Sequence, residues 1–147
     1  MPDVLEFVLD GARYGVHLDR VVEVAPRVRV MPSPGAPAHV LGAFAHRGEV
    51  ALAVDVRRRF GHAPRRASLE DHFLVVRGRE RPIAAVVDRV VGVRQVAAED
   101  VTAAPASADL AGVVALPDGL LLLDDLDGAL SPEEEEAAER ALREVGA

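Results

Sequence analysis

The side chains in this sequence that could bind a metal or act in catalysis are, above all, five histidines. They are His17, His39, His46, His62 and His72. No two of them have the HxxxH or HxH spacing that brings two ligands to one metal ion, and the chain has no cysteine to join them. Isolated histidines on strands and turns are typical of an amphipathic surface. The spacing therefore predicts no metal site and no cofactor.

The remaining nucleophiles and acids form no catalytic pattern. None of the four serines lies in a GxSxG motif, and no glycine-rich phosphate loop follows a predicted strand. Asp124 and Asp125 are adjacent at a predicted strand end, where neighbouring side chains point to opposite faces. All 17 basic residues are arginines, which excludes Schiff-base catalysis and the lysine of a P-loop. The sequence predicts a protein that is not an enzyme.

The bulk composition indicates one β-rich domain. The chain has 147 residues, which favours a single domain over residues 1–147. Hydrophobic residues make up 50% of it and aromatic residues only 3%, so valine, leucine and alanine must form the core. The N-terminus lacks a basic region followed by an apolar one, and no apolar run approaches ~20 residues. We therefore expect no signal peptide, no membrane insertion and a cytoplasmic location.

Charge is distributed unevenly along the chain. Residues 1–97 contain 15 arginines and 11 acids, a net charge of +4, whereas residues 98–147 contain 2 arginines and 13 acids, a net charge of −11. The overall net charge of −7 does not fit a general nucleic-acid binder. Two faces of opposite sign would suit a protein partner or self-assembly. The alternative is that the acids only solvate a terminal helix and nearby turns.

Short valine-rich segments predict strands along most of the chain. The predicted strands are residues 4–9, 13–18, 27–30, 42–46, 49–54, 72–77, 82–88, 90–96, 113–116 and 120–123. Prolines and small residues predict loops at 31–37 and 97–109 and a connector at 62–71, with single helical turns at 38–41 and 55–60.

A C-terminal helix is predicted over residues 132–145. Ser131 can cap it, Pro132 suits its first position, and Glu134 follows three residues after the cap. Its apolar residues recur at helical spacing and form one face: Ala138, Ala141, Leu142 and Val145. We expect that face to pack on the sheets rather than on a partner.

Two parts of the sequence are repeated. LDRVVEV at 18–24 returns as VDRVVGV at 87–93, an offset of 69, and GAFAHRGEVALAVDV at 42–56 returns as GVVALPDGLLLLDDL at 112–126, an offset of 70. Two matches at nearly one offset predict two related small barrels of about five short strands. Closing each sheet removes exposed strand edges.

The two copies differ most at one turn, which lies at Arg47-Gly48 in the first copy. The second copy has Pro117-Asp118-Gly119 there, which is ordinary turn chemistry. A turn does not need arginine, so we expect Arg47 to act at an interface, where arginine is enriched. The alternative is a solvated turn residue paired to Glu49 or Asp55. Three further arginines at 57–59 occur only in the first copy; such a run is more often a solvated face.

These segments, taken together and in order, resemble the CheW-like chemotaxis coupling (adaptor) protein family. The matching text is EFVLDGARYGVHLDRVVEV at 6–24, PAHVLGAFAHRGEVALAVDVRRRFG at 37–61 and VVDRVVGV at 86–93. The resemblance implies two intertwined five-stranded SH3-like β-barrels with a C-terminal helix. It places sub-barrel one at about residues 12–62 and sub-barrel two at about 70–128, with the N-terminal strand a candidate for exchange between them.

The resemblance also implies a function. Members of the family are non-enzymatic adaptors that bridge the cytoplasmic tip of chemoreceptors to the regulatory domain of a CheA-like histidine kinase, and they join that domain in rings. Arg47 matches the position associated with coupling, and Val21, Glu23 and Gly42 match the receptor-facing groove. With the turn residues Gly48 and His46, these form the candidate partner-binding set.

Two positions depart from the family pattern. The family usually has asparagine two residues before the arginine, where this chain has Ala45, and proline in the next strand, where it has Leu52. The chain could therefore be tuned to another receptor or kinase. The alternative function is that of a CheW-like adaptor in a non-chemotaxis pathway, such as motility or gene regulation.

Overall fold

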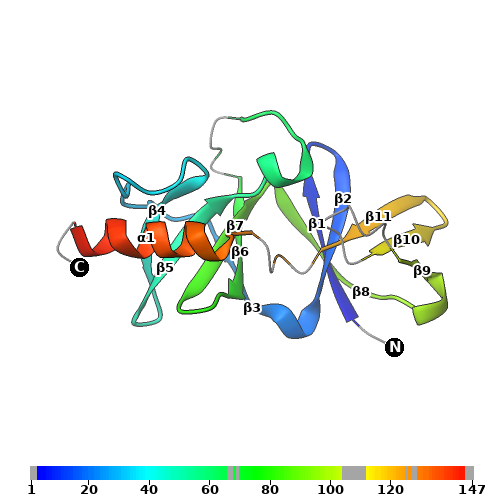
Figure 1. Ribbon diagram of the computed structural model, residues 1–147. Coiled ribbons are helices and arrows are strands. Elements are labelled where there is room, and N and C mark those ends of the chain that lie inside the picture. Colours follow the sequence, from blue (N-terminus) through cyan, green and yellow to red (C-terminus); the bar gives the residue numbers. More distant parts are fainter. Residues whose placement is uncertain are drawn as a thin grey trace.

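Two β-sheets and one α-helix make up the computed structural model of the chain (Figure 1). It describes residues 3–65, 68, 70–103, 112–124, 126 and 129–144. The predicted all-β class with a C-terminal helix is confirmed. Among these residues, no helix is long and apolar enough to cross a membrane.

The larger sheet has six strands in the order β8-β1-β2-β11-β10-β9. Their bounds are β1 Asp3–Leu9, β2 Ala12–His17, β8 Arg89–Gln95, β9 Val101–Thr102, β10 Gly112–Leu116 and β11 Gly119–Leu123. The family resemblance implied five strands in each barrel. The additional strand here is β9, which has only two residues.

The smaller sheet has five strands in the order β3-β6-β7-β5-β4. Their bounds are β3 Val21–Pro26, β4 Val40–His46, β5 Glu49–Asp55, β6 His72–Arg77 and β7 Pro82–Val87. Three short 3-10 turns connect strands: η1 Leu18–Arg20, η2 Arg58–Phe60 and η3 Ala98–Asp100.

Each sheet combines two strands from one half of the chain with three or four from the other half. In the six-stranded sheet, β1 and β2 pair with β8, β9, β10 and β11; in the five-stranded sheet, β6 and β7 pair with β3, β4 and β5. The sequence repeat is preserved in the register: Leu52 lies opposite Ile83 in the parallel pair β5–β7, and Leu122 lies opposite Tyr14 in the parallel pair β11–β2. Leu122 is 70 residues after Leu52, and Ile83 is 69 residues after Tyr14, which are the two offsets of the sequence repeat.

The strand exchange cuts across the expected sub-barrel ranges. β2 falls in the range 12–62 but lies in the sheet that β8 to β11 form, whereas β6 and β7 fall in 70–128 but lie with β3, β4 and β5. The physical reason is pairing: β2 finds its parallel neighbour in β11, and β7 finds its own in β5. A single domain over residues 1–147 stays a prediction.

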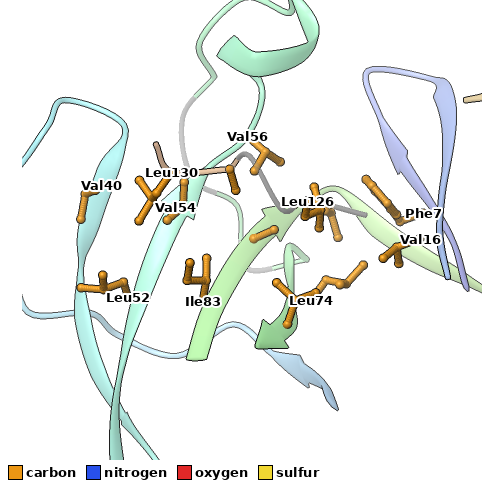
Figure 2. Packing of buried hydrophobic residues seen from close by; sticks show 14 of the residues in the cluster. Phe7, Val16, Val40, Leu52, Val54, Val56, Leu74, Ile83, Leu126 and Leu130 are labelled. Atoms are coloured by element: carbon orange, nitrogen blue, oxygen red, sulfur yellow. The ribbon is translucent and has the colours of Figure 1, made fainter. Parts of the chain in front are cut away.

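One apolar cluster lies between the two sheets and joins them. Figure 2 shows it running from Val40 and Leu52 on one side to Phe7 and Val16 on the other. A second cluster lies within the six-stranded sheet, and a third covers the other face of the five-stranded sheet. Because both faces of the central strands are covered, their sequences are nearly continuous apolar runs such as FLVV and IAAVV.

Helix α1, Pro132–Glu144, packs across the five-stranded sheet (Figure 1). The predicted cap is confirmed: the backbone N–H of Glu134 donates to Ser131 Oγ at 3.1 Å, and the N–H of Ser131 donates to Glu134 Oε1 at 2.8 Å. Ala138 and Leu142 enter the central cluster, as predicted for that face. Val145 lies outside the described residues.

Acids of α1 pair with basic residues of the first part of the chain. Glu139 accepts from Arg81 Nη2 at 2.8 Å, Glu135 Oε2 lies 3.9 Å from Arg79 Nε, and Glu134 Oε2 lies 3.1 Å from His39 Nε2. Part of the acidic C-terminal segment is therefore neutralised within the chain.

Two local predictions were wrong. Residues 27–30 form no strand, because β6 begins at His72, opposite Pro26, and offers no backbone beyond that point. Residues 38–41 form no helical turn; the N–H of Val40 donates to Pro37 O at 2.9 Å in a β-turn, and β4 begins at Val40. The predicted loop at 97–109 holds η3 and β9, and its residues from 104 on lie outside the described part of the chain.

Candidate functional site

The hairpin between β4 and β5 turns at Arg47 and Gly48. Both have positive φ, 49° and 80°, and the two-residue loop closes the pair His46–Glu49. Positive φ at both central positions is the requirement of a type I′ turn, which favours asparagine and glycine. Arginine is unfavourable in this conformation, so its presence needs a reason other than the turn.

Arg47 is held by a glutamate on the far edge of the same sheet. Its Nη2 donates to Glu23 Oε1 at 2.8 Å and its Nε donates to Oε2 at 3.2 Å. Glu23 lies on β3 and Arg47 follows β4, and these strands are the two edges of the five-stranded sheet. The sheet is thus curled until its edges approach. Met31, after β3, and Ala43 of β4 also exchange two backbone hydrogen bonds, of 2.8 and 2.9 Å.

The expected alternative for Arg47, pairing to Glu49 or Asp55, was wrong. Glu49 instead accepts from Arg77 at 3.1 and 3.2 Å, and Asp55 accepts from the backbone N–H of Arg57. The hydrogen bond from Arg47 holds the pKa of Glu23 below its usual range, so that carboxylate is charged at neutral pH. The Arg47 side chain itself is 72% exposed.

His46 lies under this pair rather than on the surface. Its side chain is only 9% exposed, and its ring meets the Phe44 ring edge-on with centroids 6.3 Å apart. His46 Nε2 lies 3.2 Å from Glu23 Oε2, yet the geometry makes no hydrogen bond. His46 therefore belongs to the site as a buried neighbour of Glu23.

Two other predicted site residues serve the fold beneath the surface. Gly42 is buried at φ 151°, beside a bulge in β4, and a Cβ there would lie 2.2 Å from Met31 O. No other residue fits that position without displacing the chain. Val21 pairs with Val76 and packs against the central cluster. Four predicted residues, Glu23, His46, Arg47 and Gly48, thus come together at the hairpin, and Gly42 and Val21 support it.

Sequence reasoning missed a set of exposed valines and a leucine. Each sheet with its connecting turns is called a lobe below. Val22, Val24 and Val50 are exposed in the lobe of the five-stranded sheet, and their equivalents in the lobe of the six-stranded sheet are exposed too. Those equivalents are Val91, Val93 and Leu120. Large apolar residues exposed at the same repeat positions are a sign of protein contact surfaces. The signal available in the sequence was their recurrence in both copies.

The arginine run at 57–59 is not a solvated face. Arg57 is 5% exposed and donates to Asp10 Oδ1 at 2.7 Å and to Asp88 Oδ1. Arg59 Nε donates to Asp124 Oδ2 at 3.0 Å. Of the three, only Arg58 is exposed. These pairs join the end of β5 to the β1–β2 turn and to the end of β11, so the run connects the two sheets.

No group of three or more histidines, aspartates or glutamates that could hold a metal ion occurs in the described part of the chain. Individual histidines have other partners. His62, for example, faces the Tyr14 hydroxyl at 2.6 Å and Asp10 at 3.5 Å.

A family model described as the CheW-like domain matches residues 3–134. This chain belongs to the CheW-like domain family. Among the proteins to which it is similar is "Chemotaxis protein CheW" of Rhizobium meliloti, 28% identical over 92% of each chain. Another is "Chemotaxis protein CheW" of Klebsiella aerogenes, 29% identical over 90% of this chain and 83% of the relative. "Protein FrzA" of Myxococcus xanthus is 28% identical over 71% of this chain and 66% of the relative.

The fold has a counterpart among solved structures. The crystal structure of the scaffolding protein TtCheW from Thermoanaerobacter tengcongensis superposes with a TM-score of 0.83 at 22% identity, over 91% of this chain and 96% of that one. At this identity the likeness concerns the fold.

The two departures from the CheW-like pattern have different surroundings. Ala45 is exposed, opposite Val50 in the hairpin and two residues before Arg47. Leu52 is 1% exposed in the central cluster. Leu52 is therefore a packing residue, whereas Ala45 changes the surface beside the candidate site.

Proposed function

We propose that this CheW-like chain is a non-enzymatic adaptor that couples the cytoplasmic tip of chemoreceptors to the regulatory domain of a CheA-like histidine kinase. The observation that carries the proposal is Arg47, an exposed arginine kept in a conformation that favours asparagine or glycine. Holding arginine at positive φ costs free energy in the backbone, and binding of the guanidinium by a partner would offset that cost. The proposal has the chain act in the cytoplasm, where both partners present these domains.

The pairing of Arg47 with Glu23 supports a role in recognition. A carboxylate that holds the guanidinium from one side reduces the side-chain entropy lost when a partner carboxylate binds the other side. A preorganised arginine of this kind is typical of interface hot spots. A Cβ added at Gly48 would have no atom within 4 Å, so the tip of the hairpin is open for close approach by a partner.

The duplicated lobes support the bridging part of the proposal. Each lobe exposes apolar residues at equivalent positions, Val22, Val24 and Val50 in one and Val91, Val93 and Leu120 in the other. Two similar surfaces with different charges beside them would let one chain hold two partners, or join a ring. Arg47 and Glu23 distinguish the surface of the five-stranded lobe.

Calorimetry tests the proposal. The purified chain is titrated with the kinase regulatory domain and, separately, with a receptor-tip helical hairpin from the same cell. We expect binding to both, and loss of at least one on changing Arg47. If the chain bound neither the kinase domain nor the receptor tip, the proposed function would be excluded for those partners.

A second candidate is a CheW-like adaptor in a non-chemotaxis pathway. The observations that favour it are the relative with a different name, Protein FrzA, and the altered surface at Ala45. Co-purification from the source cell discriminates the two candidates: a kinase recovered without any chemoreceptor would favour the second. The genes neighbouring this one would give the same distinction.

A further inference from the structure

Three charged or titratable residues meet in the five-stranded lobe at positions where the other lobe has none. They are Glu23, His46 and Arg47. The equivalents in the other lobe, by the offsets of the repeat, are Gly92, Leu116 and Pro117. β3 and β8 share a bulge at Glu23 and Gly92, and His46 and Leu116 each pair across a two-residue turn, so strand pairing requires neither Glu23 nor His46. The positive φ of Arg47 favours asparagine or glycine, so the turn does not require arginine either. Their coincidence in space therefore points to a common task.

The position of His46 is one where packing calls for an apolar side chain. Its equivalent, Leu116, packs against the apolar cluster of the six-stranded sheet. A buried imidazole is costly unless its nitrogens find partners, and Nε2 of His46 lacks a hydrogen bond in the described structure. Burying the polar ring of His46 therefore costs free energy, and the packing of the fold alone does not explain why histidine is present.

The nitrogen of His46 and the guanidinium of Arg47 approach the same oxygen. His46 Nε2 and Arg47 Nε each lie 3.2 Å from Glu23 Oε2, and Arg47 Nη2 uses the other oxygen. A neutral imidazole adds little to this arrangement. An imidazolium would be attracted to Oε2, would repel the adjacent guanidinium, and would compete with Arg47 Nε for that oxygen.

No other described acid lies as close to His46 as Glu23. The charged groups that face it are Glu23 from β3, Glu49 from β5 with its partner Arg77 from β6, and Arg47 of its own turn. Arg81 donates to Val50 O, and its charge contributes to lowering the pKa of Glu49. Because Glu49 is already paired with Arg77, Glu23 is the group on which a charge at His46 acts most strongly.

We infer that His46 is a positioning residue that couples the hold of Glu23 on Arg47 to pH. When His46 is neutral, Glu23 holds the guanidinium at two points. When His46 is protonated, it takes Oε2. Arg47 stays oriented by its hydrogen bond to Oε1, and its Nε–H becomes available to a carboxylate of a partner. Histidine is the side chain that proteins use most often as a pH sensor near neutrality. The expected effect on partner binding rests on the proposed function, whereas the contacts among Glu23, His46 and Arg47 do not.

The geometry is tested on the free, full-length chain by NMR. The Nε–H signal of Arg47 and the ring signals of His46 are followed between about pH 5.5 and 7.5. We expect the Arg47 signal to shift with the same midpoint as the His46 ring, and to be flat in His46→Leu. The leucine is the natural residue of the other lobe, so it should fold; His46→Gln is the second variant should it not. A titrating His46 beside an unchanging Arg47 would overturn the inference.

The consequence is tested with the kinase regulatory domain by calorimetry at about pH 6 and about pH 7.5. We expect wild type to bind about two- to fivefold more tightly at the lower pH, as for one exposed charge pair gained. His46→Leu should lose that difference, and the matched control His17→Gln should keep it. Equal pH dependence in wild type and His46→Leu would contradict the inference. Absence of binding at both pH values would count against the proposed function, while the NMR result still decides the role of His46.

Discussion

The guanidinium of Arg47 and the carboxylate of Glu23 join the two edge strands of one sheet through hydrogen bonds of 2.8 and 3.2 Å. Glu23 is 24 residues before Arg47 in the chain, and three strands separate β3 from β4 in the sheet order. The pair exists because the sheet curls. The other lobe has a bulge in the same register but has Gly92 at the position of Glu23, so it has no counterpart of this pair.

Replacing Arg47 by asparagine should separate the function of the turn from the function of the charge. Asparagine tolerates positive φ, and Asn-Gly is the preferred type I′ sequence, so the free energy of unfolding should change by less than about 1 kcal/mol. Binding to the kinase regulatory domain should weaken by about tenfold or more, as for loss of an arginine hot spot. Chemical denaturation and calorimetry measure the two effects.

Two further variants control this experiment. Arg47→Glu places a second carboxylate beside Glu23 and should abolish binding while the fold is retained. Arg140→Glu makes the same charge change on the exposed face of α1, where Arg140 pairs with Glu136 at 3.4 Å, and should leave binding unchanged. Unfolding of both Arg47 variants would show that Arg47 is structural instead.

Gly42→Ala should be strongly destabilising. The new Cβ would meet Met31 O at 2.2 Å, and the backbone is held at φ 151°. We expect a loss of more than about 3 kcal/mol in the free energy of unfolding. Gly92→Ala is the matched control, since Gly92 has φ 149° but no atom within 4 Å of the Cβ position. Strain alone should cost about 1 kcal/mol there. Equal losses in urea titrations would show that the approach of Met31 does not restrict this position.

Arg57→Met should destabilise the junction of the two sheets. It removes the buried guanidinium from between Asp10 and Asp88, although Asp88 keeps its pair with Arg65. Because both carboxylates are partly exposed, we expect a loss of about 1 to 2 kcal/mol, less than for a fully buried pair. Arg58→Met, one residue away on an exposed side chain, should change the free energy of unfolding by less than about 0.5 kcal/mol. If both variants unfold at the same urea concentration, the ion pairs of Arg57 do not hold the sheets together.

Stability should fall on the acid side through Glu6. Burial raises the pKa of Glu6, but hydrogen bonds from Arg13 and Arg94 outweigh this and hold the pKa below its usual range. The unfolded chain therefore binds a proton on Glu6 before the folded chain does. Its contribution is fully present above about pH 5 and is lost as pH falls through the lowered folded value.

Urea titrations at several pH values measure this dependence. The free energy of unfolding should decrease steadily below about pH 4, and Glu6→Gln should make that decrease shallower. Asp19→Asn is the control, because Asp19 is an exposed carboxylate on η1, away from Arg13 and Arg94 in the chain. A Glu6→Gln variant with the same acid dependence as wild type would assign the loss to other carboxylates.

Much of the fold could be predicted because it follows from local pattern. Alternating or continuous apolar runs predicted most strands, and Ser131 with Glu134 predicted the start of α1. The strand predicted at residues 27–30 failed because a strand needs a neighbour, and β6 ends its pairing at Pro26. The sequence pattern contains no record of where the partner strand begins.

The candidate site was predicted in part. The comparison of the two repeats singled out Arg47, because a type of residue that a turn does not need is visible in the text itself. That Glu23 holds Arg47, and that His46 lies beneath both, required the curvature of the sheet. The arginines at 57 and 59 were misjudged because charge runs are usually solvated, and only packing shows that their partners lie in the other sheet.

The sequence alone determined the elements, the duplication and the one turn in which the copies differ, since propensity, periodicity and turn chemistry act between residues close in the chain. The tertiary structure decided which strands share a sheet. It exchanged β1 and β2 for β6 and β7 between the lobes and brought Glu23 to Arg47. The reason is that strand pairing and ion pairing depend on distance in space. Two repeats with nearly the same pattern can pair within or across themselves, and only the packing of the shared core selects between the two arrangements.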